Sequence, residues 1–213
     1  MNLEKKKKVG IFFGNFGPYH HARVKAFQNY CENSNFEIIP IEISKFSSTY
    51  RWKSKFNFCQ KLISLFDFEE EKINPFLIFT KTFFLIRKKR IKVAFLPSYS
   101  PLRYFVLFLA AKANFCKTVM MNESHKGTEK AKGLTYYLKK FIVNQFNSAL
   151  VGGSLHKEYF HSLGLPKSKI FIGYDAIDND YFIKSAKKIR KNESKLNTKN
   201  EKKYLLPHSY FLS

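Results

Sequence analysis

The segment GNFGPYHH (residues 14–21) brings two glycines and two histidines together directly after an apolar run. Glycine allows a backbone to come close to a phosphate or a sugar, and a helix that starts after such a loop offers free N–H groups. We therefore expect Gly14, Asn15, Gly17 and His20 to bind substrate. The alternative is a structural tight turn, in which Asn15 tolerates a left-handed conformation. The spacing does not match GxGxxG, so it does not indicate a dinucleotide site.

A second polar group, Glu123, Ser124 and His125, stands at the end of the strand expected at residues 117–123. A carboxylate, a hydroxyl and an imidazole at this place could bind a polar substrate or transfer a proton. Glu123 and His125 are therefore catalytic candidates, and Ser124 is a binding candidate. An ordinary helix-entry loop is the alternative. No GxSxG elbow surrounds Ser124, so the adjacent serine and histidine do not indicate a hydrolase.

Three further candidates for substrate binding stand where strands are expected to end, namely Ser98, Gly152 and Gly153. Two glycines followed by a capping serine suit close approach to a ligand, although Gly-Gly pairs are also common in structural turns. The acidic segment of residues 175–180 lacks the EF-hand spacing and its final glutamate. Turn and helix-cap chemistry is favoured there, and we predict no metal site.

The elements that must position these residues alternate between strands and helices, which predicts a parallel sheet with helices on both faces. We expect strands at residues 8–14, 36–43, 92–97, 117–123, 148–153 and 169–173, and helices at 18–33, 74–90, 100–114, 128–146 and 154–164. The helix signals are Pro18, the caps Asn74, Ser100 and Ser154, and the terminal glycine Gly164. Residues 44–68 give a weak signal that fits a strand or a long loop. The pattern predicts a doubly wound, Rossmann-like α/β fold with ligands beyond the carboxyl ends of the strands.

The composition is that of a globular protein with a large excess of positive charge. Hydrophobic residues make up 45% and aromatic residues 17% of the 213 residues, which suffices for a packed core. The formal net charge of +22 suits anionic membranes, nucleic acid or phosphorylated substrates, but compositional bias with solvated lysine runs explains it equally well. No helix-turn-helix, RRM or zinc-finger pattern is present, so we expect no specific nucleic-acid partner. The three scattered cysteines indicate reduced thiols in the cytoplasm.

Residues 149–182, ALVGGSLHKEYFHSLGLPKSKIFIGYDAIDNDYF, resemble the end of the N-terminal domain in glycosyltransferase family 4. In that family a strand, a helix ending in LG, a P..KI turn and a strand leading into YD..DN.YF recur in this order. Residues 14–27 also resemble the family's first glycine loop and helix. The resemblance implies the N-terminal half of a GT-B fold, in which two Rossmann-like domains face each other across a cleft. It also implies transfer of a sugar with retention of anomeric configuration.

Such an enzyme takes a nucleotide sugar as donor substrate, and by the resemblance it needs neither a metal nor another cofactor. Its N-terminal half mainly holds the acceptor, which we expect to be a glycan or a lipid-linked sugar. The resemblance implies that Gly14, Asn15 and Gly17 lie near the donor phosphates and the acceptor. It places residues 123–125 on the opposite lip of the cleft.

The resemblance further predicts three regions: a Rossmann-like domain at residues 1–183, a basic linker at 184–203, and a truncated first strand of a donor-binding domain at 204–213. On this prediction the chain is truncated or split, is a poor catalyst alone and needs a separate donor-binding domain as partner. The alternative function is a non-catalytic basic module that adsorbs to anionic membranes or polyanions. The expected location is the cytoplasm, with peripheral contact at the inner face of the membrane.

Overall fold

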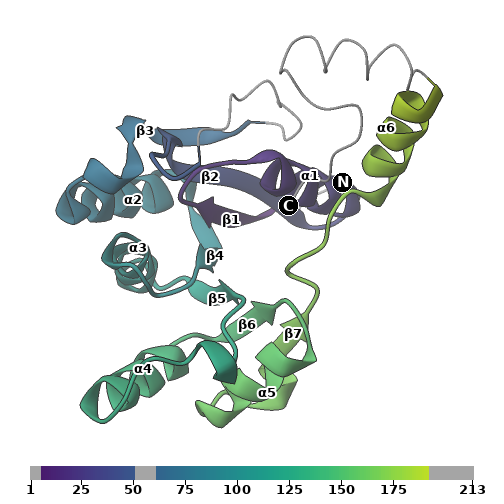
Figure 1. The fold of residues 1–213 in the computed structure, drawn as a ribbon. Coiled ribbons are helices and arrows are strands. Elements are labelled where there is room, and N and C mark those ends of the chain that lie inside the picture. Colours follow the sequence, from purple (N-terminus) through teal and green to yellow (C-terminus); the bar gives the residue numbers. More distant parts are fainter. Residues whose placement is uncertain (1–5, 51–60, 192–213) are drawn as a thin grey trace. The chain divides into compact units, whose positions relative to one another are not determined.

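The protein is built around a sheet of parallel strands (Figure 1). The computed structural model describes residues 6–50 and 61–191, and within these the sheet has seven strands in the order β3-β2-β1-β4-β5-β6-β7. The strands are β1 (Lys7–Phe13), β2 (Phe36–Phe46), β3 (Ile63–Glu69), β4 (Ile91–Pro97), β5 (Lys117–Asn122), β6 (Ser148–Val151) and β7 (Ile170–Ile172). Every neighbouring pair is parallel, which confirms the predicted doubly wound, Rossmann-like α/β fold.

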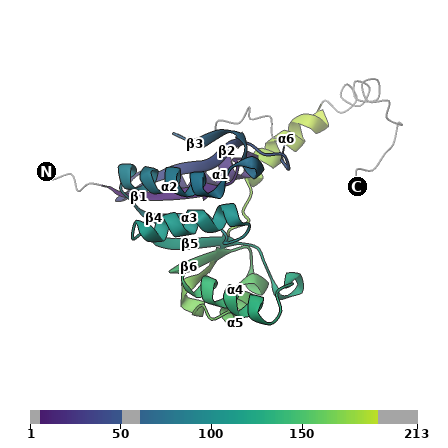
Figure 2. The same cartoon turned by 90° about the vertical axis from the view of Figure 1, so that its left-hand side faces the viewer.

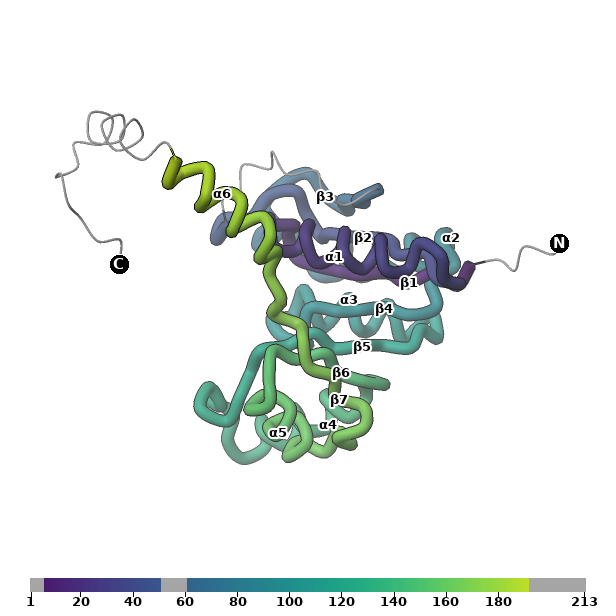
Figure 3. Tube along the Cα trace, turned by 90° about the vertical axis from the view of Figure 1, so that its right-hand side faces the viewer, coloured from purple at the N-terminus to yellow at the C-terminus, as the bar shows by residue number. Residues whose placement is uncertain are grey.

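Helices connect the strands and cover both faces of the sheet. Helix α1 lies on one face, and α2 and α3 lie on the other (Figures 2 and 3). The helices of this part are α1 (Pro18–Tyr30), α2 (Pro75–Lys89), α3 (Leu102–Ala113), α4 (Leu134–Asn144) and α5 (Ser154–Ser162), with 3-10 turns η1 (Glu70–Lys72), η2 (Lys126–Thr128) and η3 (Lys167–Lys169).

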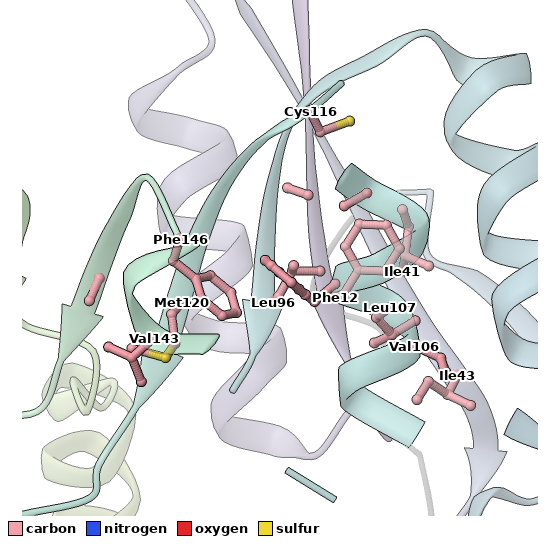
Figure 4. Packing of buried hydrophobic residues seen from close by; sticks show 14 of the residues in the cluster. Phe12, Ile41, Ile43, Leu96, Val106, Leu107, Cys116, Met120, Val143 and Phe146 are labelled. Carbon is pink, nitrogen blue, oxygen red and sulfur yellow. The ribbon is translucent and has the colours of Figure 1, made fainter. Parts of the chain in front are cut away.

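Alternation along the strands divides the core into two clusters, one on each face of the sheet. On β1, Phe12 belongs to the larger cluster, while Ile11 and Phe13 belong to the smaller cluster under α1. In the larger cluster, Met120 of β5 packs beside Phe146, which follows α4 (Figure 4). Burying each such side chain contributes roughly 1.5–3 kcal/mol, so the central strands hold their carboxyl ends firmly in place.

Residues 44–68, whose sequence pattern gives only a weak signal, include most of an additional strand. Strand β2 continues to Phe46, and β3 occupies Ile63–Glu69 at the edge of the sheet, while residues 51–60 lie outside the described part. Only Phe66 of β3 is buried; the other side chains are half-buried or exposed. The sequence ISLFDFE of β3 mixes polar and apolar residues without strict alternation, so its pattern does not distinguish a strand from a loop.

The predicted helix caps are right in part. Asn74 caps α2 as predicted, because its side chain accepts a backbone N–H at 2.9 Å. Ser100 and Ser154 are wrong as caps: the cap positions are Pro101 and Gly153, and neither helix start has a side-chain cap.

Helix α4 is shorter than the predicted span of residues 128–146. It begins only at Leu134, after Gly133, whose φ of 54° lies in the region that favours glycine. The sequence pattern extended the helix too far because residues 126–133 are rich in residues that also suit a helix. The glycine predicted to end α5, Gly164, has φ 109° and is confirmed as a terminator.

The chain divides into two compact units, Met1–Ala176 and Ile177–Ser213. The described part of the second unit, residues 177–191, contains α6 (Asn179–Lys191). Before this helix the Asp178 side chain accepts the Tyr181 N–H at 2.9 Å, which is the predicted cap chemistry. Residues 184–191 of the predicted linker lie in this helix, and residues 192–213 lie outside the described part. The predicted domain boundaries therefore stay predictions. No described helix has both the length and the apolar character that crossing a membrane requires.

Candidate functional site

A pocket of about 950 Å³ lies at the carboxyl ends of β1, β4 and β5. Phe13, Pro97 and Asn122, the last residues of these strands, all line it. Strand order reverses beside β1, because β2 lies on one side and β4 on the other, and such switch points are where sheets of this class bind ligands. Of the predicted site residues, the pocket is lined by Gly14, Asn15, Gly17, His20, Ser98, Glu123 and Ser124.

The first glycine loop is held by its own hydrogen bonds. Phe16 donates its backbone N–H to Glu42 Oε2 at 2.9 Å, and Gly17 donates its N–H to His20 Nδ1 at 3.1 Å. Two N–H groups of the loop are therefore already occupied. This leaves fewer donors for a phosphate than the sequence suggested.

His20 is a neutral side chain at physiological pH. Burial, followed by the charge of Arg23, lowers the pKa of its imidazole to about 4. The ring stacks on Phe13 with centroids 4.1 Å apart, and Nδ1 accepts the Gly17 N–H. His20 therefore caps the start of α1, and it also lines the pocket.

Asn15 does not adopt the left-handed conformation considered for it, because the described residues with positive φ do not include residues 14–17. Its Nδ2 donates to the Ser44 carbonyl oxygen at 3.1 Å. The side chain thus fastens the loop to β2, and its Oδ1 has no partner among the described residues.

Glu70, at the start of η1, is a pocket residue that sequence analysis missed. It is 5% exposed, and burial raises the pKa of its carboxyl to about 7 despite the nearby charge of Arg103. Arg103 Nη2 lies 3.5 Å from Glu70 Oε1, and the same guanidinium lies over the Tyr104 ring, with its Cζ 5.2 Å from the centroid. Burial likewise raises the pKa of Tyr104 to about 12.

Gly14 is required by the close approach of these groups. A Cβ atom at this position would lie 2.2 Å from Glu70 Oε2 and 2.5 Å from Tyr104 Oη. Both distances are far below contact, so a larger side chain would displace the carboxyl and the phenol. The glycine is therefore explained by packing against η1 and α3, and not by backbone conformation.

Three buried polar atoms in the pocket wall have no hydrogen-bond partner among the described residues: Asn15 Oδ1, Glu70 Oε2 and Arg103 Nε. Buried polar atoms are nearly always hydrogen-bonded in native proteins, and leaving one unpaired costs about 1–3 kcal/mol. All three atoms belong to residues that line this one pocket.

The loop after β5 is organised by Asn122, another residue that sequence analysis did not single out. Its Nδ2 donates to Ser98 Oγ, and its Oδ1 accepts the Ser124 N–H at 2.6 Å. The Asn122 amide thereby connects Ser98, which directly follows β4 and has φ 67°, with the loop after β5. Glu123 is exposed at the pocket, and partial burial, followed by the charge of Asp175, raises the pKa of its carboxyl.

The other predicted residues do not line the pocket. His125 is the N-cap residue of the turn η2, and its Nδ1 accepts the Gly127 N–H at 3.2 Å. Gly152 and Gly153 lie beside His156 at the start of α5, and a Cβ at Gly152 would be 3.7 Å from Glu123 Cγ. They stand next to the pocket loop without forming its wall.

The positive charge of the described residues is not concentrated in this pocket. Among the described residues, those that line it include one arginine and two glutamates but no lysine. Inspection of the loops after the strands missed Asn122, because this residue is the last one of β5 and lies within the strand predicted at residues 117–123. Arg103 was missed because it lies in the first turn of α3 and not in the preceding loop. Glu70 was beyond reach because it follows the unrecognised strand β3.

Searches with family models and among curated proteins found no match to this chain. Solved structures do match. The chain is similar to UDP-N-acetylglucosamine 2-epimerase from Rickettsia bellii, with TM-score 0.59 and 11% identity over 96% of this chain and 52% of that one. It is similar to a glycosyltransferase from Rickettsia africae ESF-5, with TM-score 0.53 and 12% identity over 95% and 50%. UDP-GlcNAc 2-epimerase from Neisseria meningitidis, bound to UDP-GlcNAc, matches with TM-score 0.54 and 8% identity over 78% and 46%.

The chain thus spans about half the length of the structures that it matches. At such low identity the likeness concerns the fold, which is the Rossmann-like α/β architecture that makes up half of a GT-B enzyme. Membership of glycosyltransferase family 4 stays a prediction, since no family model matches.

Proposed function

We propose that this chain is the acceptor side of a GT-B glycosyltransferase that takes a nucleotide sugar as donor and retains its anomeric configuration. The observation that carries the proposal is the group of unpaired polar atoms on Asn15, Glu70 and Arg103. Sugar hydroxyls donate and accept hydrogen bonds, so one ring can complement both the carbonyl oxygen of Asn15 and the Nε–H of Arg103.

The charge of the pocket supports a neutral, hydroxylated acceptor over a phosphate in this position. Arg103 is the only lysine or arginine among the described lining residues, and its guanidinium already lies beside Glu70. A diphosphate would need more cationic donors than that. We therefore propose that the acceptor, and not a phosphate, is the main contact of Gly14, Asn15 and Gly17.

We propose that Glu70 exchanges a proton with the reacting hydroxyl of the acceptor. A carboxyl with a pKa of about 7 exchanges its proton readily at neutral pH, as acid–base catalysis of a hydroxyl requires. Glu123 is exposed at the same pocket and remains a second candidate. His125 is a weaker candidate, because it is outside the lining and its Nδ1 already accepts a hydrogen bond.

We propose that the groups that bind the nucleotide-sugar donor lie outside the described pocket. Departure of a nucleoside diphosphate requires groups that stabilise its developing charge, and the described pocket offers few. The chain spans about half of the matched structures, so we propose that a donor-binding domain completes the cleft, either in another chain or in a longer form of this one. The match to a structure bound to UDP-GlcNAc supports a nucleotide sugar as the donor class.

The test is a titration of the protein with methyl glycosides of glucose, galactose and N-acetylglucosamine, followed by saturation-transfer NMR. At least one glycoside should bind, and Glu70→Gln and Arg103→Met should each weaken its binding about tenfold, since the first replaces one carboxyl oxygen by an amide NH₂ group and the second removes a buried polar partner. The matched controls are Glu158→Gln and Lys167→Met, which break an exposed ion pair of 2.9 Å on the α5 side. Absence of binding by every glycoside, or equal affinity of the pocket and control variants, would contradict the proposal.

A further inference from the structure

Helix α4 carries apolar side chains on two opposite sides. On its inner side Val143 is fully buried in the larger core cluster and Tyr136 packs partly buried against that cluster. The outer side carries a second set at spacing i, i+3, i+4 and i+7, which defines one stripe along the helix. This outer stripe consists of Leu134, Tyr137, Leu138 and Phe141, which are 85%, 68%, 57% and 63% exposed.

The outer stripe is more than the scattered apolar exposure that every protein surface shows. Its four large side chains follow one another along the same face of a single helix, whereas the inner face already supplies the contacts that hold α4 to the sheet. A contiguous apolar patch of this kind marks an interaction surface. Folding of the described part does not require it.

The surroundings of the stripe are positively charged. From residue 126 to residue 144 the sequence has five lysines and one glutamate. The glutamate, Glu129, accepts hydrogen bonds from Lys139 Nζ at 2.7 Å and from Tyr159 Oη, so its charge is used inside the fold. The remaining four lysines are exposed and form no salt bridge with described residues; they are Lys126, Lys130, Lys132 and Lys140.

We propose that α4 docks the protein on an anionic lipid bilayer. The outer stripe enters the boundary between headgroups and acyl chains, and the exposed lysines contact the acidic headgroups. With 11 residues the helix is about 16 Å long, so it lies in the plane of the interface and does not cross the bilayer. Tyr137 suits this position because tyrosine is favoured at membrane interfaces.

The positive charge around the outer stripe favours an acidic bilayer over a second copy of this chain as its partner. A second copy of this chain would bring its own lysines against Lys130, Lys132 and Lys140, which is repulsive, whereas an acidic bilayer neutralises them. The loop of residues 129–133 joins α4 to Thr128, which lines the pocket. Docking through α4 would therefore hold the pocket near the membrane surface. This inference stands without the proposed sugar transfer.

Flotation of the protein with vesicles tests the proposal. The protein should float with vesicles of equal parts phosphatidylcholine and phosphatidylserine, and much less with phosphatidylcholine alone. The double variant Leu138→Gln, Phe141→Gln should reduce the bound fraction at least about tenfold, because it removes half of the inserted apolar side chains. The pair Lys132→Gln, Lys140→Gln should weaken binding and flatten its dependence on salt.

The matched control is Leu77→Gln, Phe84→Gln, which removes the same two side-chain types from exposed positions of α2. It should bind the acidic vesicles as the unmodified protein does. Circular dichroism checks that each variant remains folded. Equal binding to neutral vesicles, or equal loss in the α2 and α4 variants, would overturn the proposal. So would a dimer in analytical ultracentrifugation that dissociates in the α4 variant, because the stripe would then be a protein interface.

Discussion

Glu70, Arg103 and Tyr104 combine chemistry that is costly to bury. A carboxyl that is 5% exposed is more stable when neutral than when charged, which is why burial raises its pKa to about 7. The guanidinium at 3.5 Å from Glu70 Oε1 offsets this cost only partly. The group is therefore maintained at the expense of stability, as binding sites often are.

Replacing Glu70 by glutamine should make the protein more stable at high pH. Because the folded-state pKa of about 7 lies above the ordinary value of 4.5, the stability contributed by protonation is complete below about pH 4.5 and is lost as pH rises through 7. Glutamine stays neutral, so the stability of Glu70→Gln relative to the unmodified protein should rise by on the order of 2 kcal/mol from pH 4.5 to pH 8. Urea unfolding at several pH values measures this difference. A difference that does not change with pH would show that the carboxyl titrates normally.

Gly14→Ala should destabilise the protein by about 1–3 kcal/mol, because the added methyl group overlaps Glu70 Oε2 and Tyr104 Oη. Gly153→Ala is the matched control, since a Cβ there meets nothing closer than 3.7 Å and φ is −168°. Thermal unfolding of both variants gives the comparison. Equal effects would mean that the loop around Gly14 relaxes freely.

At the scale of elements, the segment between β5 and α4 is positioned by Glu129. Its carboxylate accepts hydrogen bonds from Lys139 Nζ at 2.7 Å, from Tyr159 Oη and from the Ala131 N–H at 2.7 Å. One side chain thereby connects the pocket loop with α4 and α5. Although burial acts to raise it, these bonds hold the pKa of the Glu129 carboxyl at about 2.

Glu129→Gln should therefore cost about 1–3 kcal/mol near neutral pH, the value expected for losing charge-assisted hydrogen bonds. Since the folded-state pKa lies below the ordinary value, this stability is present above about pH 4.5 and disappears as pH falls toward 2. Denaturant unfolding at neutral and acidic pH tests both statements. Glu158→Gln, in an exposed pair with Lys167, should change stability by less than about 1 kcal/mol. A similar loss in both variants would show that Glu129 makes no special connection.

The elements also show how far the sequence could predict this fold. Six of the seven described strands were predictable from their apolar runs, and Asn74 from its capping position before a proline. Strand β3 was not, because the sequence signal of residues 44–68 is weak, whereas β7, the other edge strand, also has one buried residue but is marked by its apolar run IFI. Sequence patterns find the loops after strands, and thus most of the residues around the pocket. They cannot find Glu70, whose place depends on the packing of η1 against α3 and the first glycine loop.

At the scale of the whole molecule, two surfaces of the first unit carry the functional proposals. The pocket presents unpaired polar atoms and little net charge, whereas α4 presents an apolar stripe among lysines. The net charge of +22 therefore has a proposed role at a surface outside the pocket. Acceptor binding and membrane docking are separable, since the residues that carry them differ.

The central claim is that the pocket at the carboxyl ends of β1, β4 and β5 binds a sugar, and amide chemical-shift mapping during a methyl glycoside titration tests it most directly. We predict that the largest shifts occur at Gly14, Asn15, Glu70 and Arg103, and that Glu70→Gln reduces them at the same glycoside concentration, as binding that is about tenfold weaker requires. Shifts that are absent, or that cluster on residues far from this pocket, would contradict the account.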